Sequence, residues 1–98
     1  MIEIVAMMKV RDRALFHEFE SEAAKIMQRY GGEIISAFEP SEELSKGRDF
    51  DEVHILRFPS EQAFADYRGD AALMELADLR EQAIAETEVY VSGKRVNY

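Results

Sequence analysis

The stretch EVHILRFPSE at residues 52–61 decides the fold, because a strand ends and a helix begins inside it. Glu52–Phe58 is rich in Val, Ile and Phe, which is typical of a strand. Pro59 has no backbone donor and disfavours helical geometry in the residue before it. The Ser60 hydroxyl can accept from a free N–H of the first helical turn, and Glu61 suits the positive end of the helix dipole.

Upstream of this junction the pattern predicts a strand, a helix and a second strand. Ile2–Val10 is largely apolar on both alternating faces, so as a strand it requires cover on both sides. Asp12 is a plausible N-cap for a helix whose apolar stripe runs from Leu15 to Tyr30 at helical spacing. Gly31-Gly32 ends that helix, since glycine adopts the left-handed region without a Cβ penalty. Glu33–Phe38 is then the second strand.

Downstream, the half that begins at Glu52–Phe58 repeats the same order. Pro40–Asp51 is a polar connection, and it is long for a hairpin loop. The helix from Ser60 is interrupted at Arg68-Gly69-Asp70, and Asp70 can cap a further helical segment running to about Thr87. Glu88–Val96 reads as the last strand, bent at Gly93.

The order β-α-β, a connection, then β-α-β predicts an α+β, ferredoxin-like fold with a four-stranded antiparallel sheet. We expect a single domain over residues 1–98 with the helices on one face of the sheet. The other face is also apolar by the strand patterns, and a large exposed apolar patch usually marks an interface. The sequence therefore predicts a homodimer joined through sheet faces or edges.

Composition excludes several classes of function. The chain has 20 acidic and 12 basic residues, for a formal net charge of -8, and such a field repels nucleic acid. It has no cysteine, which excludes disulfides, a thiol nucleophile and a cysteine zinc site. The sequence shows neither a signal peptide nor a membrane span, and we expect a cytoplasmic protein without membrane partners.

Two short elements carry a resemblance to a known family. Tyr30-Gly31-Gly32 precedes the second strand and Phe58-Pro59-Ser60 follows the third, with Ala63-Phe64 and Tyr67 in the next helix. Two further elements, Leu79-Arg80 and Thr87-Glu88, precede the last strand. Over nearly its full length the chain resembles the dimeric α/β-barrel superfamily, and within it the small bacterial domain-of-unknown-function family DUF1330.

The resemblance implies a homodimer in which two sheets pack face to face. Relatives in the superfamily include cofactor-free monooxygenases, haem-degrading enzymes and muconolactone isomerases, and they often hold ligands between sheet and helices. The family offers no catalytic motif to transfer. Many members carry a Trp-Tyr pair in the second helix, where this chain has Asp66-Tyr67, and it has no tryptophan at all. That absence counts against the haem-degrading branch.

Arg80 is the first candidate for a ligand contact. It falls on the apolar stripe of the last helix, between Leu76 and Ala83. A guanidinium in an apolar setting requires an anionic partner, and its shape suits a carboxylate. The alternative is an arginine that extends to solvent or pairs with a structural acid.

Three further residues could contribute to a site. His54 lies in mid-strand on an otherwise apolar face; it is a catalytic candidate if that face lines the cleft, and an interface histidine if it meets the partner. Arg57, on the opposite face, could pair across the dimer or reach the cleft. Tyr67 is a weak catalytic and ligand-binding candidate, although a tyrosine there usually packs its ring and hydrogen-bonds through its hydroxyl. His17 lies among glutamates and is predicted to be exposed.

We predict neither a metal site nor a cofactor, because His17 and His54 lie on different elements with no ligand spacing between them.

Two hypotheses of function remain. The first is an enzyme or binding protein that takes a small anionic or carbonyl-containing molecule in the cleft, including a cofactor-free monooxygenase or isomerase of the dimeric α/β-barrel type. The second is a non-catalytic structural or regulatory dimer, and fold analogy does not choose between them.

Overall fold

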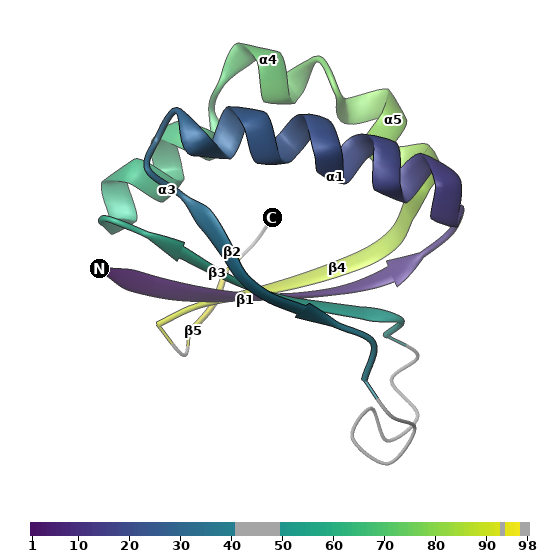
Figure 1. Ribbon diagram of the computed structural model, residues 1–98, viewed down its shortest axis with the longest axis horizontal. Coiled ribbons are helices and arrows are strands. Elements are labelled where there is room, and N and C mark those ends of the chain that lie inside the picture. The colour runs from purple at the N-terminus through teal and green to yellow at the C-terminus, as the bar shows by residue number, and fades with distance from the viewer. Residues whose placement is uncertain (41–49, 93, 97–98) are drawn as a thin grey trace.

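The computed structural model describes residues 1–40, 50–92 and 94–96, with side-chain surroundings given through residue 92. An antiparallel sheet with the strand order β2-β3-β1-β4-β5 forms one layer. The helices form a second layer over one of its faces (Figure 1). The strands are β1 (Ile2–Val10), β2 (Glu33–Phe38), β3 (Glu52–Phe58), β4 (Ile84–Val91) and β5 (Lys94–Val96). The helices are α1 (Arg13–Gln28), α3 (Glu61–Arg68), α4 (Ala71–Met74) and α5 (Ala77–Ala83).

The expected ferredoxin-like βαββαβ order is confirmed for the four long strands. Helix α1 follows β1, and α3 to α5 connect β3 to β4, so the two halves interleave and β1 lies between β3 and β4. None of the described helices is both long and apolar enough to cross a membrane.

The junctions predicted from sequence have the expected capping contacts. The Ser60 hydroxyl accepts from the Ala63 N–H at 3.1 Å. Asp12 caps α1 by accepting from the Leu15 N–H at 3.0 Å, and Asp70 caps α4 by accepting from the N–H groups of Ala72 and Leu73. Gly31, with φ at 74°, takes the left-handed conformation that follows the end of α1. Each cap satisfies backbone donors that a helix start leaves without intrahelical partners.

The C-terminal part differs from the prediction at three points. The single helical segment expected from Asp70 is divided into α4 and α5. Helical structure ends at Ala83 rather than near Thr87, so Ile84–Thr87 belongs to the strand β4. The expected single strand Glu88–Val96 is instead two strands, because the chain turns after Val91 and β5 pairs back along β4 as a short fifth strand at the edge. The predicted bend at Gly93 lies outside the described residues, as does most of the Pro40–Asp51 connection.

The core fills the space between the sheet and the helices. Its four largest fully buried side chains are Phe16, Phe58, Ile4 and Val89. Strand alternation sends Ile4, Ala6 and Met8 of β1 toward the helices, and it leaves Val5 and Met7 on the open face. Strand β1 thus divides its apolar residues between a covered and an uncovered face.

Candidate functional site

A small cavity lies inside the core, between the sheet and the helical layer. Its volume is about 70 Å³, and its walls come from β1, β2, β3, β4, α1, α3 and α5. Most of the lining is apolar, with Met8 and Phe16 among the contributors. The titratable side chains that line it are Glu20, His54, Tyr67 and Arg80. A mostly apolar cavity with a few convergent polar groups is the usual form of a small-molecule site.

Arg80 reaches this cavity from α5, as its place on the apolar stripe suggested. It is half-buried, and its Nη2 donates to the Thr87 hydroxyl of β4 at 3.3 Å. Thr87 also lines the cavity. The guanidinium thus brings a positive charge to an otherwise apolar wall.

His54 faces the helices rather than the open side of the sheet. Its side chain is only 7% exposed, and its ring packs 5.8 Å from the Phe16 ring of α1, centroid to centroid. His54 therefore lies on the side of the sheet that faces the helices, which is one of the two placements that the sequence left open. His17, by contrast, is exposed, as predicted.

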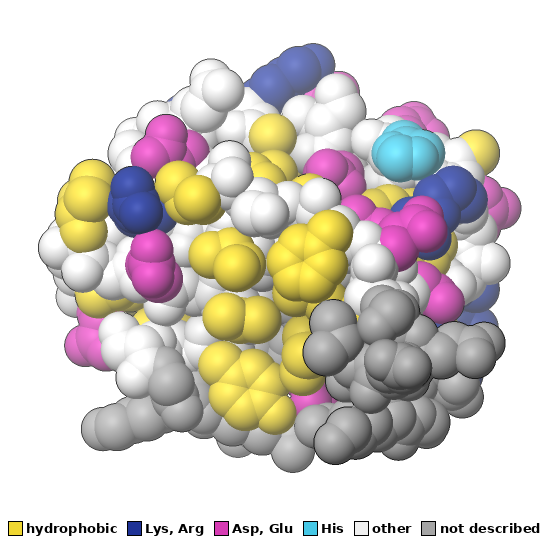
Figure 2. Space-filling model, turned by 60° about the horizontal axis from the view of Figure 1, so that its bottom comes forward, with side chains coloured by type: hydrophobic (Ala, Val, Ile, Leu, Met, Phe, Trp, Pro, Cys, Tyr) yellow, Lys and Arg dark blue, Asp and Glu magenta, His cyan; other side chains and the backbone are white. Residues whose placement is uncertain are grey.

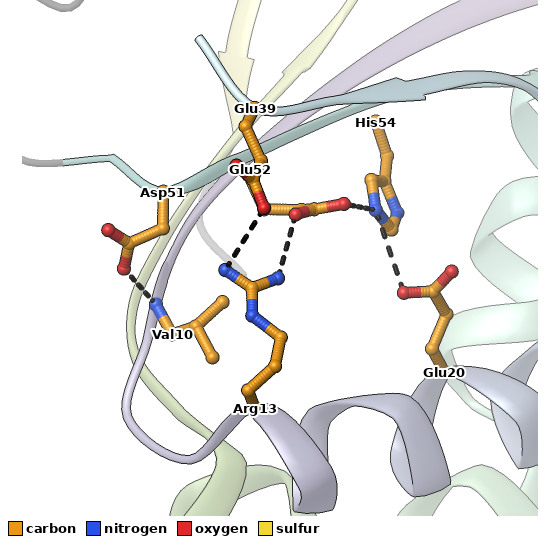
Figure 3. A network of polar contacts seen from close by, with 7 residues as sticks. All are labelled: Val10, Arg13, Glu20, Glu39, Asp51, Glu52 and His54. Carbon is orange, nitrogen blue, oxygen red and sulfur yellow. Dashed lines mark hydrogen bonds and ion pairs between the residues drawn. The ribbon is translucent and has the colours of Figure 1, made fainter. Parts of the chain in front are cut away.

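Two carboxylates converge on the Nε2 atom of His54 (Figure 3). Glu52 Oε2 lies 3.0 Å from Nε2 and Glu20 Oε2 lies 3.6 Å from it. The other oxygen of Glu52 accepts from Arg13 Nη1 at 2.9 Å, and Arg13 also approaches the exposed Glu39. The result is a polar network that crosses from α1 to β3.

The network fixes the chemistry of the imidazole. An ionised carboxylate only accepts, so the 3.0 Å contact with Glu52 places a proton on Nε2. In the neutral ring this leaves a lone pair on Nδ1, and the second nitrogen can accept a proton or a hydrogen bond. A carboxylate that orients a histidine in this way is a recurrent arrangement in acid–base catalysis.

Sequence reasoning found His54 but missed Glu20 and Glu52. Glu20 was not singled out, yet it follows the buried Phe19 directly and lies one turn after the buried Phe16. Glu52 was taken only as the start of a strand. Its spacing of two from His54 was the available signal, since residues i and i+2 of a strand share a face.

The other two candidates lie in different places. Tyr67 lines the cavity and is buried, with its ring against Phe58 and Phe64. Arg57 lies on the open face of the sheet, where its Nη2 pairs with Glu3 at 3.1 Å. It is therefore not part of the cavity group.

A second polar pair ties the helical layer together. The Tyr30 hydroxyl, just after α1, donates to Asp70 Oδ2 at the start of α4. This hydrogen bond lowers the pKa of Asp70 below its ordinary value and raises the pKa of Tyr30 above its own. The pair is structural, because neither residue lines the cavity.

Comparison with known proteins supports the fold. The family model described as "Domain of unknown function (DUF1330)" matches residues 4–94. A protein of unknown function from Rhodopseudomonas palustris, RPA0582, superposes with a TM-score of 0.79 at 19% identity, over 92% of this chain and 78% of that one. No curated protein matches.

Two further solved structures are similar. At3g17210 of Arabidopsis thaliana gives a TM-score of 0.69 at 15% identity, over 93% of this chain and 92% of that one. SnoaB, a cofactor-independent oxygenase from Streptomyces nogalater, gives a TM-score of 0.64 at 16% identity, over 91% of this chain and 89% of that one. The structural neighbours are dimeric α/β-barrel proteins, so the chain has that fold.

Proposed function

The chain belongs to the DUF1330 family, and we propose that it binds a small, mostly apolar molecule with an anionic or carbonyl group in the cavity between sheet and helices. The observation that carries the proposal is the placement of Arg80 and His54 on the walls of one apolar cavity. Arg80 would orient the anionic or carbonyl oxygen, because a guanidinium donates to such groups in a fixed fork geometry.

The volume of the cavity limits the ligand. At about 70 Å³ it is less than half of the roughly 150 Å³ that admits benzene in an engineered protein cavity. A ligand of a few heavy atoms fits the cavity as it stands. A larger one requires side chains to move, and the walls include the flexible Met8 and Met27.

A cofactor-free enzyme is the second candidate function. The observation that favours it is the contact of Glu52 with the cavity-lining His54, which leaves a lone pair on Nδ1 that can accept a proton. Tyr67 is the alternative proton carrier, since it also lines the cavity. The neighbour SnoaB is described as a cofactor-independent oxygenase, which shows that this fold accommodates such chemistry in another protein.

We also propose that the protein is a homodimer joined through the open sheet face. Hydrophobic side chains gather at the centre of that face, with acidic and basic side chains toward its sides (Figure 2). The patch joins residues of four strands that register places on one face: Val5, Met7, Phe38, Ile55 and Tyr90. An apolar surface of this kind is typical of an interface.

Butyrate tests binding in the cavity, because it joins a short apolar chain to a carboxylate. It has as many heavy atoms as benzene, so its entry requires Met8 or Met27 to move. We expect butyrate to raise the melting temperature of the protein, and we expect its amide, butyramide, to do so far less. In Arg80→Gln the affinity for butyrate, measured by calorimetric titration, should fall about tenfold or more, since a hydrogen bond to a charged group is lost.

Arg29→Gln is the matched control, because Arg29 is exposed just after α1 and does not line the cavity. It should bind butyrate as the wild type does. Equal loss of affinity in both variants would mean that butyrate binding depends on the overall charge of the protein, and the cavity proposal would then fail.

A further inference from the structure

We propose that Glu20, Glu52 and His54 form a binding site for one divalent transition-metal cation. The ligand atoms would be one oxygen of each carboxylate and the Nε2 of the imidazole. These three side chains come from α1 and β3, and they point toward one another (Figure 3).

The spacing of the three donor atoms suits a common cation. Metal–ligand bonds of about 2.0–2.2 Å place neighbouring ligands roughly 3.0–3.5 Å apart in octahedral or tetrahedral geometry. Here Nε2 lies 3.0 Å from Glu52 Oε2 and 3.6 Å from Glu20 Oε2, and all three donors lie within 4.8 Å of one another. Small side-chain shifts would therefore complete the coordination.

The charge of the cluster provides a separate argument. Glu52 is balanced by Arg13, whose Nη1 lies 2.9 Å from its Oε1. Glu20 is only 30% exposed, and its ion-pair partner is His54, whose Nε2 lies 3.6 Å away. The carboxylate closer to Nε2 is that of Glu52, at 3.0 Å. A cation between the two carboxylates would compensate the charge of Glu20.

The donor set indicates the class of metal. Imidazole suits zinc, iron, copper and nickel, whereas carboxylates alone suit magnesium, calcium and manganese. One imidazole with two carboxylates therefore fits Zn²⁺ or Fe²⁺ better than Mg²⁺ or Ca²⁺. Three protein ligands leave at least one coordination position open, and Glu20 and His54 both line the cavity.

This inference goes beyond ligand binding in the cavity and does not depend on it. Glu52 does not line the cavity, and the test below requires no organic ligand. If a cation binds, Nε2 gives up its proton to become a ligand. The same histidine would then serve as a metal ligand in the loaded protein and as a proton acceptor in the metal-free protein.

Cobalt(II) is a suitable probe, because bound Co²⁺ absorbs visible light according to its coordination. The untagged protein is freed of metal with a chelator, dialysed and titrated with Co²⁺. We expect one equivalent to bind per chain with visible absorption bands. His54→Asn and Glu20→Gln should each weaken Co²⁺ binding at least tenfold, since losing even a residue that only supports a metal ligand lowers metal affinity by this much.

The chain offers a matched control for each variant. His17 is the other of its two histidines, and Glu18 is an exposed glutamate on the same helix as Glu20. His17→Asn and Glu18→Gln should therefore bind Co²⁺ as the wild type does. Should His54→Asn fail to fold, Glu20→Gln still tests the site at a partly exposed position. Absence of any stoichiometric Co²⁺ binding, or loss in the control variants alone, would overturn the proposal.

Discussion

At the scale of single residues, the two elements that carry the family resemblance are in contact. A Cβ added at Gly32 would lie 2.5 Å from ring carbons of Phe58, and one added at Gly31 would lie 2.9 Å from Pro59 Cγ. The end of α1 therefore packs directly on the end of β3. Sequence showed both elements separately, but their contact depends on the pairing of β2 with β3, which is a tertiary feature.

Gly32→Ala tests this contact. The new methyl group has no room beside Phe58 and Met27, so we expect the free energy of unfolding to fall by about 1–3 kcal/mol. Urea unfolding measures the change. Gly69→Ala is the control, since its nearest contacts would be 3.6 Å or more away and its φ of −92° suits alanine. A Gly32→Ala protein as stable as Gly69→Ala would contradict the packing described.

The Tyr30–Asp70 pair makes stability depend on pH. Because the pKa of Asp70 is lowered in the folded state, the pair contributes stability above the ordinary pKa of 3.8. That contribution is lost as the pH falls through the lower pKa that Asp70 has in the folded state. Tyr30→Phe should therefore destabilise the protein at neutral pH and make little difference in strong acid. A pH-independent difference between the two proteins in urea unfolding would exclude this coupling.

At the scale of elements, local signals located the starts of α1, α3 and α4 well, but they missed the start of α5 and placed its end too late. Helix α5 passes into β4 at Ala83–Ile84 without a glycine or proline, and the apolar helical spacing continues through Ile84. The change is fixed by distant contacts: the N–H groups of Arg11 and Asp12 both donate to the carbonyl of Ala83. A one-dimensional pattern does not contain such contacts.

The junction after β3 gives a direct test of a helix start. Ser60→Ala removes the hydroxyl that accepts from the Ala63 N–H, and we expect a loss of about 1 kcal/mol in the free energy of unfolding. Ser60→Asp keeps an acceptor and should retain most of the stability. If both variants unfold at the same urea concentration as the wild type, the cap does not stabilise α3.

At the scale of the whole molecule, the fold brings together what the sequence keeps apart. The fold class was predicted from the order of strands and helices. His54 and Arg80 were selected as site candidates because each is a polar or charged residue on an otherwise apolar face. The carboxylate of Glu20 meets His54 only because α1 crosses over β3. Spacing along the chain pairs Glu52 with His54 but does not place Glu20 beside them, and it left Arg57 undecided between two faces.

The proposed dimer can be tested on the open sheet face. Ile55→Lys places a charge at the centre of the apolar patch without entering the helix-facing core. We expect light scattering to give twice the 11.3 kDa mass of one chain for the wild type and a single-chain mass for the variant. Met74→Lys, at an exposed position on α4, should remain dimeric. A wild-type protein with a single-chain mass at micromolar concentration would contradict the interface.

Entry of a ligand into the cavity between sheet and helices can be followed directly with the five methionines of the chain. Met8 and Met27 line the cavity, Met7 lies on the open face, and Met1 and Met74 are exposed. Carbon-13 NMR of the methionine methyl groups during a butyrate titration should move the Met8 and Met27 signals together and leave the other three in place. Unchanged Met8 and Met27 signals at saturating butyrate, or shifts confined to Met7 or Met74, would contradict the account.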